Sequence, residues 1–494
     1  MQHAEMPLSI ATSALVGIRG APVEVEVDVS TGIPAVRIVG LPDPAVGEAR
    51  ERIRSAIRAS GFTWPARRIT VNLAPADLRK SGGSFDLAIA LGILAASGQL
   101  QLKGRSIAAV GELALDGRVR NVPGALPLAL PLAAREAVHL LVPLEIAAEL
   151  QVDGAGSISG VTSLSDAVAL LAGAKREAHS SARSVSIRSD LQHRAVSDEE
   201  CELSTIRGQP GATRAVLIAA VGRLPLLLEG PPGVGKSMLA RALHGVLPDL
   251  TTIEGSEVRA ISSAAGLERG SSARPPLRMP HHDLTVAGLI GGGPRLAPGE
   301  LTWAHRGLLI LDEIGEFRRD TLEALREPLE RGVIDLVRAG RSEQFPAAAL
   351  LVATGNPCGC GELERFDGAC LCTPAARRRG SLSLSAPIRD RFALRVRLAR
   401  SHAPLSALPP GGVTTVVGRA AVERARVALP PAAAREGMVD GRLLQRVVAR
   451  FSEQVSGRGW GQLLNVAVIC ALLNGVERVG DAELAEALHL TGRT

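Results

Sequence analysis

The sequence predicts a multidomain α/β protein with a P-loop domain at its centre. An apolar strand at 226–229 runs into a glycine-rich loop at 230–237, and a helix-forming stretch follows at 238–247. A second apolar strand, at 307–311, ends on a pair of carboxylates. Strand, loop and helix in this order are the arrangement of a phosphate-binding loop. A length of 494 residues allows about three domains.

The glycine-rich loop fits phosphate chemistry. Its residues are Gly230, Pro231, Pro232, Gly233, Val234, Gly235, Lys236 and Ser237. Glycines let several backbone N–H groups point at one anion, and the positive end of the following helix faces the same anion. Lys236 would add a charge at the β and γ phosphates of a nucleotide, and the Ser237 hydroxyl would bind Mg²⁺.

The carboxylate pair, Asp312 and Glu313, supplies the other half of an ATPase site. Asp312, at the end of its strand, would hold Mg²⁺ together with Ser237. Glu313 would polarise the attacking water as general base. The loop and the acidic pair together predict ATP binding and Mg²⁺-dependent ATP hydrolysis.

Composition narrows the class of protein. Apolar residues make up 46% and charged residues 21%, and the 2% of aromatic residues predicts an aliphatic core. The net charge of +6 is too small to argue by itself for nucleic acid. The chain has no uninterrupted apolar run long enough for a membrane span and no secretory leader pattern, so we expect a cytoplasmic protein. In that compartment the six cysteines are thiols or metal ligands.

Residues 1–172 form a first block of mixed α+β character. Strands are expected at 23–29, 36–39, 68–73 and 107–113, and helices at 46–60 and 85–97. Residues 173–200 then change to a polar composition rich in Ser and Arg, which is typical of a solvated linker.

Four stretches of this block resemble the N-terminal domain of the ComM (YifB) family of magnesium-chelatase-like AAA+ ATPases. They are Gly40-Leu-Pro42, Val71-Asn-Leu-Ala-Pro-Ala-Asp-Leu78, the segment 82–90, and Gly111-Glu-Leu-Ala-Leu-Asp-Gly117. The resemblance implies a fold like ribosomal protein S5 and the Lon protease domain for 1–172. It also implies an AAA+ magnesium-chelatase-like domain at 201–402 and a helical lid at 403–494.

A Lon-like domain raises the question of proteolysis. Ser84 stands at the nucleophile position of the Lon pattern, but the helix expected after Gly124 contains no lysine to act as its base. A serine without a base is a weak nucleophile. We therefore expect a non-proteolytic domain.

Further motor motifs follow the acidic pair. A helix is expected at 320–331, then a β-hairpin from 333 to 348, a strand at 349–353 and Asn356. This order resembles the pre-sensor-1 hairpin clade of AAA+ motors, which implies that Asn356 is sensor 1. In that clade Arg338 and Arg341 would face the pore of a ring and contact DNA. The alternative is an exposed surface hairpin.

Two clusters could bind metal. Four cysteines, Cys358, Cys360, Cys370 and Cys372, fall within a short segment and suit a tetrahedral Zn²⁺ site, with reduced thiols as the alternative. Upstream, His281 and His282 are adjacent. Neighbouring side chains on an extended segment point apart, which favours a structural or DNA-facing loop over a metal site.

Arginines complete the motor pattern that the resemblance implies. Arg391 matches the arginine finger, which reaches the ATP of the neighbouring subunit, with Arg389 as the alternative. Arg458 matches sensor 2, although the second arginine usual in the family is absent from 466–468. A hinge is expected at 403–418.

The resemblance implies a homo-oligomeric ring, most simply a hexamer. Its work would be translocation on DNA without sequence preference, as in branch migration during DNA uptake and recombination. Two other functions stay open. One is a metal-chelatase motor subunit, and the other is an ATP-switched assembly factor that binds a protein partner through its first domain.

Overall fold

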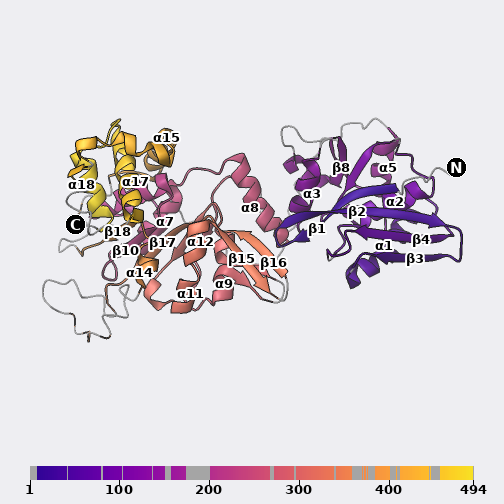
Figure 1. Cartoon of the computed structure of the whole chain (residues 1–494), viewed down its shortest axis with the longest axis horizontal. Helices are drawn as coiled ribbons and strands as arrows, with labels where there is room; N and C mark the ends of the chain where they lie inside the picture. The colour runs from indigo at the N-terminus through magenta and orange to yellow at the C-terminus, as the bar shows by residue number, and fades with distance from the viewer. Residues whose placement is uncertain are drawn as a thin grey trace. The chain divides into compact units, whose positions relative to one another are not determined.

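The computed structural model describes most of the chain as two compact units, Met1–Ser189 with Ser256–Ser272 and Asp190–Gly255 with Ala273–Thr494 (Figure 1). The residues described are 8–41, 43–78, 80, 82–102, 104–135, 137–150, 157–173, 201–267, 272–293, 296–338, 341–358, 370, 372–373, 375, 384–400, 408, 412–443, 445–446 and 457–492. Apart from Gly173, the predicted linker at 173–200 lies outside them.

The first unit is built on a seven-stranded sheet in the order β3-β4-β2-β1-β5-β8-β9. Its strands are β1 (Leu8–Val16), β2 (Arg19–Ser30), β3 (Ala35–Val39), β4 (Arg68–Ala74), β5 (Ser106–Ala109), β8 (Val138–Pro143) and β9 (Ile158–Val161). Strand β2 pairs antiparallel with both β1 and β4, and the other pairings are parallel.

Helices cover both faces of this sheet. The remaining elements of the unit are α1 (Pro44–Ala59), α2 (Asp86–Ala96), α3 (Ala125–Ala133), α4 (Leu144–Ala147), α5 (Leu164–Ala172), η1 (Ala148–Leu150) and the ribbon of β6 (Glu112–Leu113) with β7 (Val119–Arg120). In β5, Ile107 and Ala109 share a core with α1, α2 and α5. Ala108 between them packs with α3 instead. Since strand side chains alternate between faces, α2 and α3 lie on opposite sides.

The first unit differs from the prediction in several places, and strands β8 and β9 and helix α5 are among the elements that were not predicted. The expected strand at 107–113 is interrupted, because Gly111 has a φ of +156° and donates its N–H to the Ser84 carbonyl rather than to a ladder partner. Strand β1 was not predicted. It lies between β2 and β5 with Ile10 to Ala14 all buried, so it lacks the polar alternation that marks a half-exposed strand.

The second unit contains a five-stranded sheet in the order β11-β14-β17-β10-β18, with parallel pairing throughout. The strands are β10 (Leu226–Glu229), β11 (Leu277–Arg278), β14 (Leu308–Leu311), β17 (Leu350–Gly355) and β18 (Leu394–Arg397). Strands β14, β17 and β10 are consecutive in this order. Their carboxyl ends, where the predicted motifs begin, therefore meet at one edge.

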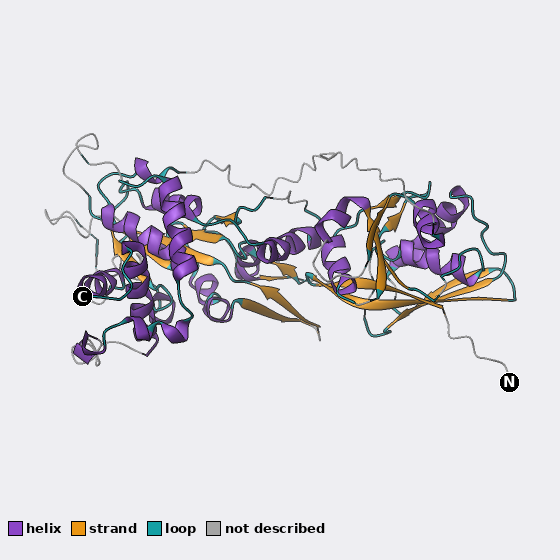
Figure 2. Cartoon of the chain, turned by 90° about the horizontal axis from the view of Figure 1, so that it is seen from above, coloured by secondary structure: helices purple, strands orange, loops and turns teal. Residues whose placement is uncertain are grey.

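The second unit also contains a set of helices (Figure 2). They are α6 (Pro210–Gly222), α7 (Lys236–Val246), α9 (Val286–Ile290), α10 (Glu300–Trp303), α11 (Arg319–Glu323), α12 (Arg326–Arg331), α14 (Ala386–Arg389), α15 (Thr415–Ala428), α17 (Gly457–Asn474) and α18 (Asp481–Leu490). Helix α8 (Thr252–Ala264) begins in this unit, and its residues from Ser256 onward belong to the first unit. Short 3-10 turns are η2 (Leu203–Thr205), η3 (Ile314–Glu316), η6 (Ala432–Ala434) and η7 (Glu436–Met438). One hydrophobic core joins α6, α7, α15, α17 and α18 to the sheet. The C-terminal helices thus pack directly on the P-loop domain.

The helix predicted at 320–331 is two helices, α11 and α12. The reason is Pro328, which has no N–H to bond the Ala324 carbonyl and whose ring clashes with that carbonyl in a continuous helix. Helix α11 therefore ends at Glu323, and α12 restarts after a turn in which Leu325 donates to Leu322.

The predicted β-hairpin is confirmed. Strands β15 (Val333–Arg338) and β16 (Arg341–Pro346) pair antiparallel, and the last paired residues are Arg338 and Arg341. The two predicted DNA-contacting arginines therefore sit at the end of the ladder, beside the turn. A second small ribbon, β12 (Gly291–Gly292) with β13 (Ala297–Pro298), lies against the hairpin near Leu336.

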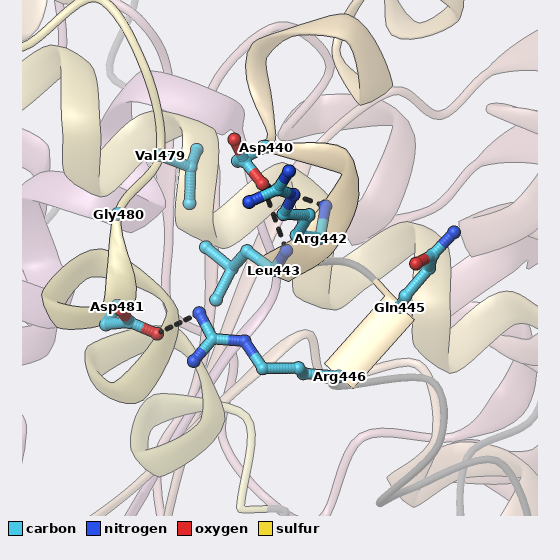
Figure 3. A pocket seen from close by; sticks show the side chains of 8 residues that line it. All are labelled: Asp440, Arg442, Leu443, Gln445, Arg446, Val479, Gly480 and Asp481. Carbon is cyan, nitrogen blue, oxygen red and sulfur yellow. Dashed lines mark hydrogen bonds and ion pairs between the residues drawn. The ribbon is translucent and has the colours of Figure 1, made fainter.

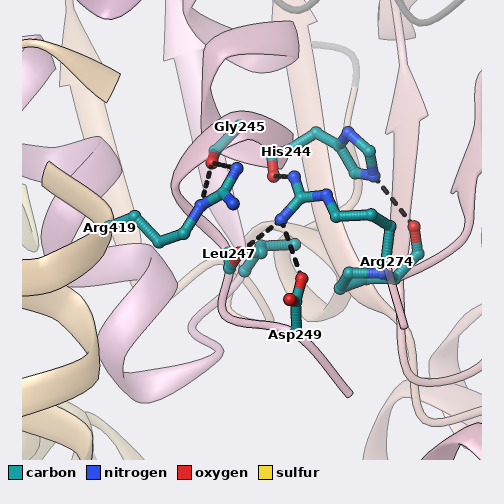
Figure 4. Close-up of polar contacts among 7 residues, drawn as sticks. His244, Gly245, Leu247, Asp249, Arg274 and Arg419 are labelled. Carbon is teal, nitrogen blue, oxygen red and sulfur yellow. Dashed lines mark hydrogen bonds and ion pairs between the residues drawn. The ribbon is translucent and has the colours of Figure 1, made fainter. Parts of the chain in front are cut away.

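The C-terminal end of α7 is held by two arginines from distant parts of the chain (Figure 4). Arg419 of α15 donates through Nε and Nη2 to the Gly245 carbonyl, at 2.9 and 2.7 Å. Arg274 donates to the carbonyls of His244 and Leu247, at 2.9 and 3.0 Å. These carbonyls lie at the negative end of the helix, so cations suit them, and the His244 carbonyl also accepts the Leu247 N–H at 3.2 Å.

Among the described helices, none is both long enough and apolar enough to span a membrane.

Replacing Arg419 should loosen α15 from the P-loop helix. Arg419→Met keeps an apolar stem but leaves the buried Gly245 carbonyl without its donors, at a cost of about 1–3 kcal/mol. A thermal melt of the second unit should then shift down by about 2–4 °C for each kcal/mol. Arg424→Met, at an exposed position of the same helix, is the matched control. Equal melting temperatures for the two variants would contradict this role.

Candidate active site

Three hydroxyl and carboxylate groups form a chain across the edge of the parallel sheet. Ser237, at the start of α7, donates to both oxygens of Asp312, at 2.9 and 3.1 Å. Thr354, near the carboxyl end of β17, donates to Asp312 Oδ1 at 2.5 Å. The same Thr354 oxygen accepts the Glu313 N–H at 2.9 Å. Residues after β10, β14 and β17 are thereby fixed to one another.

Lys236 reaches across the same edge. Its Nζ donates to the carbonyls of Gly230 and Pro231, both at 2.8 Å, and to Asn356 Oδ1 at 3.0 Å. Burial lowers the pKa of its ammonium group, whereas the nearby charges of Asp312 and Glu313 raise it. A buried ammonium group beside open backbone N–H groups is arranged to meet an anion.

The loop itself takes the conformation that its glycines allow. Gly233 and Gly235 have φ values of +81° and +93°, which L side chains rarely adopt. Gly230 donates its N–H to the Gly355 carbonyl at 3.1 Å, and a Cβ there would lie 2.6 Å from the Leu398 carbonyl oxygen. The loop is therefore anchored between β17 and β18 and has no room for a larger residue at its first position.

Glu313 differs from its neighbour Asp312 in backbone conformation and in exposure to solvent. Its φ is +54°, in the left-handed region that is uncommon for non-glycine residues and frequent at functional sites. Its side chain is exposed, while Ile314 after it is buried. The strained backbone directs one carboxylate to the sheet edge and leaves the other open to water, as a general base requires.

Thr354 is the residue of this site that sequence reasoning missed. It is fully buried and connects Asp312 to the backbone of Glu313. The sequence signal for this residue was weak. Threonine is common in strands, so one hydroxyl after the apolar residues 350–353 does not mark a functional site.

The two predicted ATP-contacting arginines do not join this network. Arg391 donates to Glu330 Oε2 at 2.8 Å, and Arg458 donates to Glu330 Oε1. The structure therefore brings Lys236, Ser237, Asp312 and Asn356 together, and it gathers Arg391 and Arg458 around a different carboxylate. The alternative finger, Arg389, donates to the Leu384 carbonyl at 3.0 Å.

Three of the four clustered cysteines lie close together. The sulfur atoms of Cys358, Cys370 and Cys372 are all within 4.8 Å of one another, and Cys358 is fully buried. The Cys358 and Cys370 sulfurs are 3.7 Å apart. Cys360 falls outside the described residues.

The prediction that the side chains of His281 and His282 point apart is wrong. Their ring centroids are 4.0 Å apart, because the segment turns rather than extends, with the Leu284 N–H bonded to the His281 carbonyl. Asp283 lies near both rings. His281 and Asp283 are well exposed, whereas His282 is partly buried and meets the edge of Phe317.

In the first unit, Ser84 is nearly buried and Lys80 is fully buried. The Lys80 ammonium group donates to the Pro75 carbonyl. Nearby Asp86 pairs with Arg52 at 2.9 Å, and burial raises the pKa of Asp86 to about 6.

A separate cavity of about 710 Å³ lies between the segments 440–446 and 479–481 (Figure 3). Arg446 and Asp481 form an ion pair across it at 3.2 Å. Asp440 accepts from the backbone N–H groups of Arg442 and Leu443. None of the predicted ATP-site residues lines this cavity.

Two family models match the chain. The model described as "Magnesium chelatase, subunit ChlI" matches residues 202–404 and thus spans the whole network at the sheet edge. The model described as "Subunit ChlI of Mg-chelatase" matches residues 25–146 of the first unit.

Full-length relatives decide the family. The chain is 36% identical over 509 residues to the "Uncharacterized protein YifB" of Salmonella typhimurium, covering 98% of this chain and 97% of that protein. It is also 36% identical over 511 residues, with the same coverage, to the "Competence protein ComM" of Haemophilus influenzae. The chain belongs to the ComM/YifB family of magnesium-chelatase-like proteins.

A shorter similarity links this ComM/YifB protein to a chelatase subunit. The "Magnesium-chelatase 38 kDa subunit" of Cereibacter sphaeroides is 30% identical over 173 residues, which are 31% of this chain and 52% of that protein. The mixed α/β fold with its parallel sheet is consistent with a magnesium-chelatase-like AAA+ fold. Membership of this family implies the use of ATP and Mg²⁺.

Thr354→Val should weaken binding of Mg·ATP. Valine fills the same volume but leaves the Asp312 carboxylate and the Glu313 N–H without their shared partner. Loss of such an outer partner lowers metal affinity by about 10–100-fold. Titration with a fluorescent ATP analogue, with Mg²⁺ and with EDTA, measures this. Thr302→Val, which replaces a buried hydroxyl without a hydrogen-bond partner, is the control. The same affinity in both variants would rule out the bridging role.

Proposed function

We propose that this protein is a Mg²⁺-dependent ATP hydrolase that works as a ring-forming motor on DNA. The observation that carries the ATPase proposal is the network at the sheet edge. Lys236 and Ser237 of one loop meet Asp312 and Asn356, which follow the two neighbouring strands of the sheet. An ammonium group, a hydroxyl, a carboxylate and an amide converge where a nucleotide binds in a sheet of this topology.

Each group has a distinct role in the proposed reaction. The loop N–H groups and Lys236 bind the phosphates. The hard oxygen donors of Ser237 and Asp312 lie 2.9 Å apart and fit Mg²⁺, which when bound would neutralise charge on the phosphate oxygens. Asn356 orients the attacking water, and Glu313 takes its proton as general base.

The proposed active site is completed between subunits. Arg391 and Arg458 are cations of the kind that stabilise the phosphoryl-transfer transition state, yet both bind Glu330 rather than a group of the P-loop network. We propose that they act on the γ-phosphate at a subunit interface of a homo-hexamer. The pre-sensor-1 hairpin clade, the S5/Lon-like fold of the first domain, and the domain limits 1–172, 201–402 and 403–494 belong to the same proposal.

DNA is the proposed track of this motor. The hairpin β15–β16 ends on Arg338 and Arg341, and the segment 365–400 holds nine arginines against two acidic residues. Such groups suit phosphates rather than base edges, so binding is expected to ignore sequence. One relative is named a competence protein, and on that ground the proposed work on DNA is in uptake and recombination; branch migration is the specific activity that we propose.

DNA-stimulated ATP hydrolysis tests the proposal. Synthetic four-way junctions and single strands should raise the ATPase rate, and the protein should separate the arms of the junction in the presence of ATP. Glu313→Gln should keep nucleotide binding and reduce turnover by more than about 100-fold, because the general base is lost.

An ATPase rate indifferent to every DNA substrate would contradict the DNA motor. It would favour an assembly factor that binds a protein partner through its first domain, or a chelatase-type motor. Hydrolysis that survives Glu313→Gln would show that the base is another group.

We further propose that the cysteine cluster binds Zn²⁺. The thiols of Cys358, Cys370 and Cys372 already lie within the distances that one tetrahedral ion requires, and thiolates are the ligands that zinc prefers. Cys360 is the proposed fourth ligand. The ion would cross-link a segment that follows β17 directly and so lies close to Asn356.

Metal analysis of protein prepared without added zinc tests this site. We expect about one zinc per chain, and Cys370→Ser should release it because three thiolates and a hydroxyl bind zinc poorly. Cys201→Ser, which lies outside the cluster, should retain the metal. Wild-type protein free of zinc, or equal zinc in both variants, would contradict the proposal.

A further inference from the structure

One carboxylate, that of Glu330, links two arginines that come from different parts of the second unit. Its Oε2 accepts from Arg391 at 2.8 Å, and its Oε1 accepts from Arg458. Arg391 follows α14 and is 13% exposed, whereas Arg458 belongs to the first turn of α17. Glu330 itself lies in the last turn of α12 and is half exposed.

A second contact fixes the same junction. Gln462, one turn beyond Arg458 in α17, donates to the Asp390 carbonyl at 3.1 Å. The first turns of α17 are thus bound both to the residue before Arg391 and, through Glu330, to Arg391 itself. The Arg391 Nε is buried and has no hydrogen-bond partner among the residues that the structure describes. A buried guanidinium donor of this kind is costly unless a further acceptor arrives.

The electrostatics favour a holding role for Glu330. Two guanidinium groups repel each other, and a carboxylate between them offsets that repulsion. The pair with Arg458 is well exposed and weak by itself, whereas in the pair with Arg391 the guanidinium group is largely shielded from water and Glu330 is half exposed. A guanidinium has enough donors to keep Glu330 and to bind a phosphate at the same time.

Glu330 also lies at the root of the β15–β16 hairpin. Helix α12 ends at Gly332, and β15 begins at the next residue. Arg331, beside Glu330, donates to Asp335 in the hairpin at 2.5 Å. Helix α12 and the hairpin are therefore joined both by the chain and by this ion pair.

We propose that Glu330 is a positioning residue that presents Arg391 and Arg458 as one pair to the same phosphate and connects that pair to the root of the hairpin. Binding of the γ-phosphate to the two arginines changes their ion pairs with Glu330. Helix α12 then shifts, and the hairpin β15–β16 that follows it shifts with it. The inference rests on the proposed ATPase function, because it takes the phosphate of ATP as the ligand of both arginines.

The test compares Glu330→Gln with Glu327→Gln in the full chain. Glutamine keeps the shape of the side chain but removes the charge that holds the arginines. We expect Glu330→Gln to lower kcat about tenfold, to leave the KM for ATP nearly unchanged, and to remove stimulation by DNA. Among the described residues Glu327 pairs with Arg331 on an exposed surface and contacts neither Arg391 nor Arg458, so Glu327→Gln should give wild-type values. A kcat equal to that of Glu327→Gln, or a rise in kcat from freed arginines, would overturn the proposal.

A double-mutant cycle separates positioning from a general structural defect. Arg391→Ala should lower kcat by much more than tenfold, since an arginine finger is worth about 10³-fold or more. Adding Glu330→Gln to it should cost little further, because the pair of arginines that Glu330 presents no longer exists once Arg391 is removed. Effects that multiply in full would mean that Glu330 acts independently of Arg391, and the proposal would fail.

A readout without ATP turnover keeps this proposal apart from the proposed function. Trp460 lies in the first turn of α17, two residues after Arg458, and packs partly buried against the core, and the other two tryptophans can be removed by Trp64→Phe and Trp303→Phe. In that background Glu330→Gln should increase quenching of Trp460 fluorescence by acrylamide, and Glu327→Gln should not. Increased quenching in a protein without ATPase activity would refute the proposed function alone. Unchanged quenching in an active ATPase would refute the role of Glu330 alone.

Discussion

The hydrogen bonds of Asp312 to Ser237 and Thr354 set the geometry on which the rest of the second unit depends. They join the first residues of α7 to the carboxyl ends of β14 and β17, and the loop after β10 is anchored in turn to Gly355. An aliphatic core formed with the surrounding helices holds these strands in parallel register. Since the polar groups lie on adjacent strands, a shift of any one strand would separate the ammonium, hydroxyl and carboxylate groups that a magnesium nucleotide requires.

The network has the groups to bind a nucleotide, but its proposed arginines lie elsewhere. Arg391 and Arg458 are held by Glu330, on a short helix that continues into the hairpin β15–β16. The same unit ties the far end of α7 to α15 through Arg419. The P-loop helix therefore contacts the phosphate site at one end and the C-terminal helices at the other. In the proposed ring, changes at the phosphate would be transmitted to the helical lid through α7 and Arg419. They would be transmitted to the hairpin through Glu330 and the short helix that precedes it.

Sequence reasoning recovers the parts whose chemistry is local. The phosphate loop, the Asp312–Glu313 pair and the hairpin follow from residue type and spacing, because each is formed by consecutive residues. Thr354 and Glu330 could not be found in this way, since their roles depend on partners far away in the chain. Strand β1 escaped because it is buried on both faces, and one predicted helix became two because Pro328 removes a single hydrogen bond. The paired rings of His281 and His282 show how one turn can reverse an argument based on extended geometry.

The proposed ATP site is completed by a neighbouring subunit, and rings assembled from two different variants provide the strictest test. Lys236→Ala removes phosphate binding but retains Arg391, whereas Arg391→Ala retains phosphate binding but lacks the finger. Each variant alone should be nearly inactive. We predict that an equimolar mixture hydrolyses ATP faster than the sum of the two, because intact loops then meet intact arginines across some interfaces. A mixture no more active than that sum, in rings shown to exchange subunits, would contradict it.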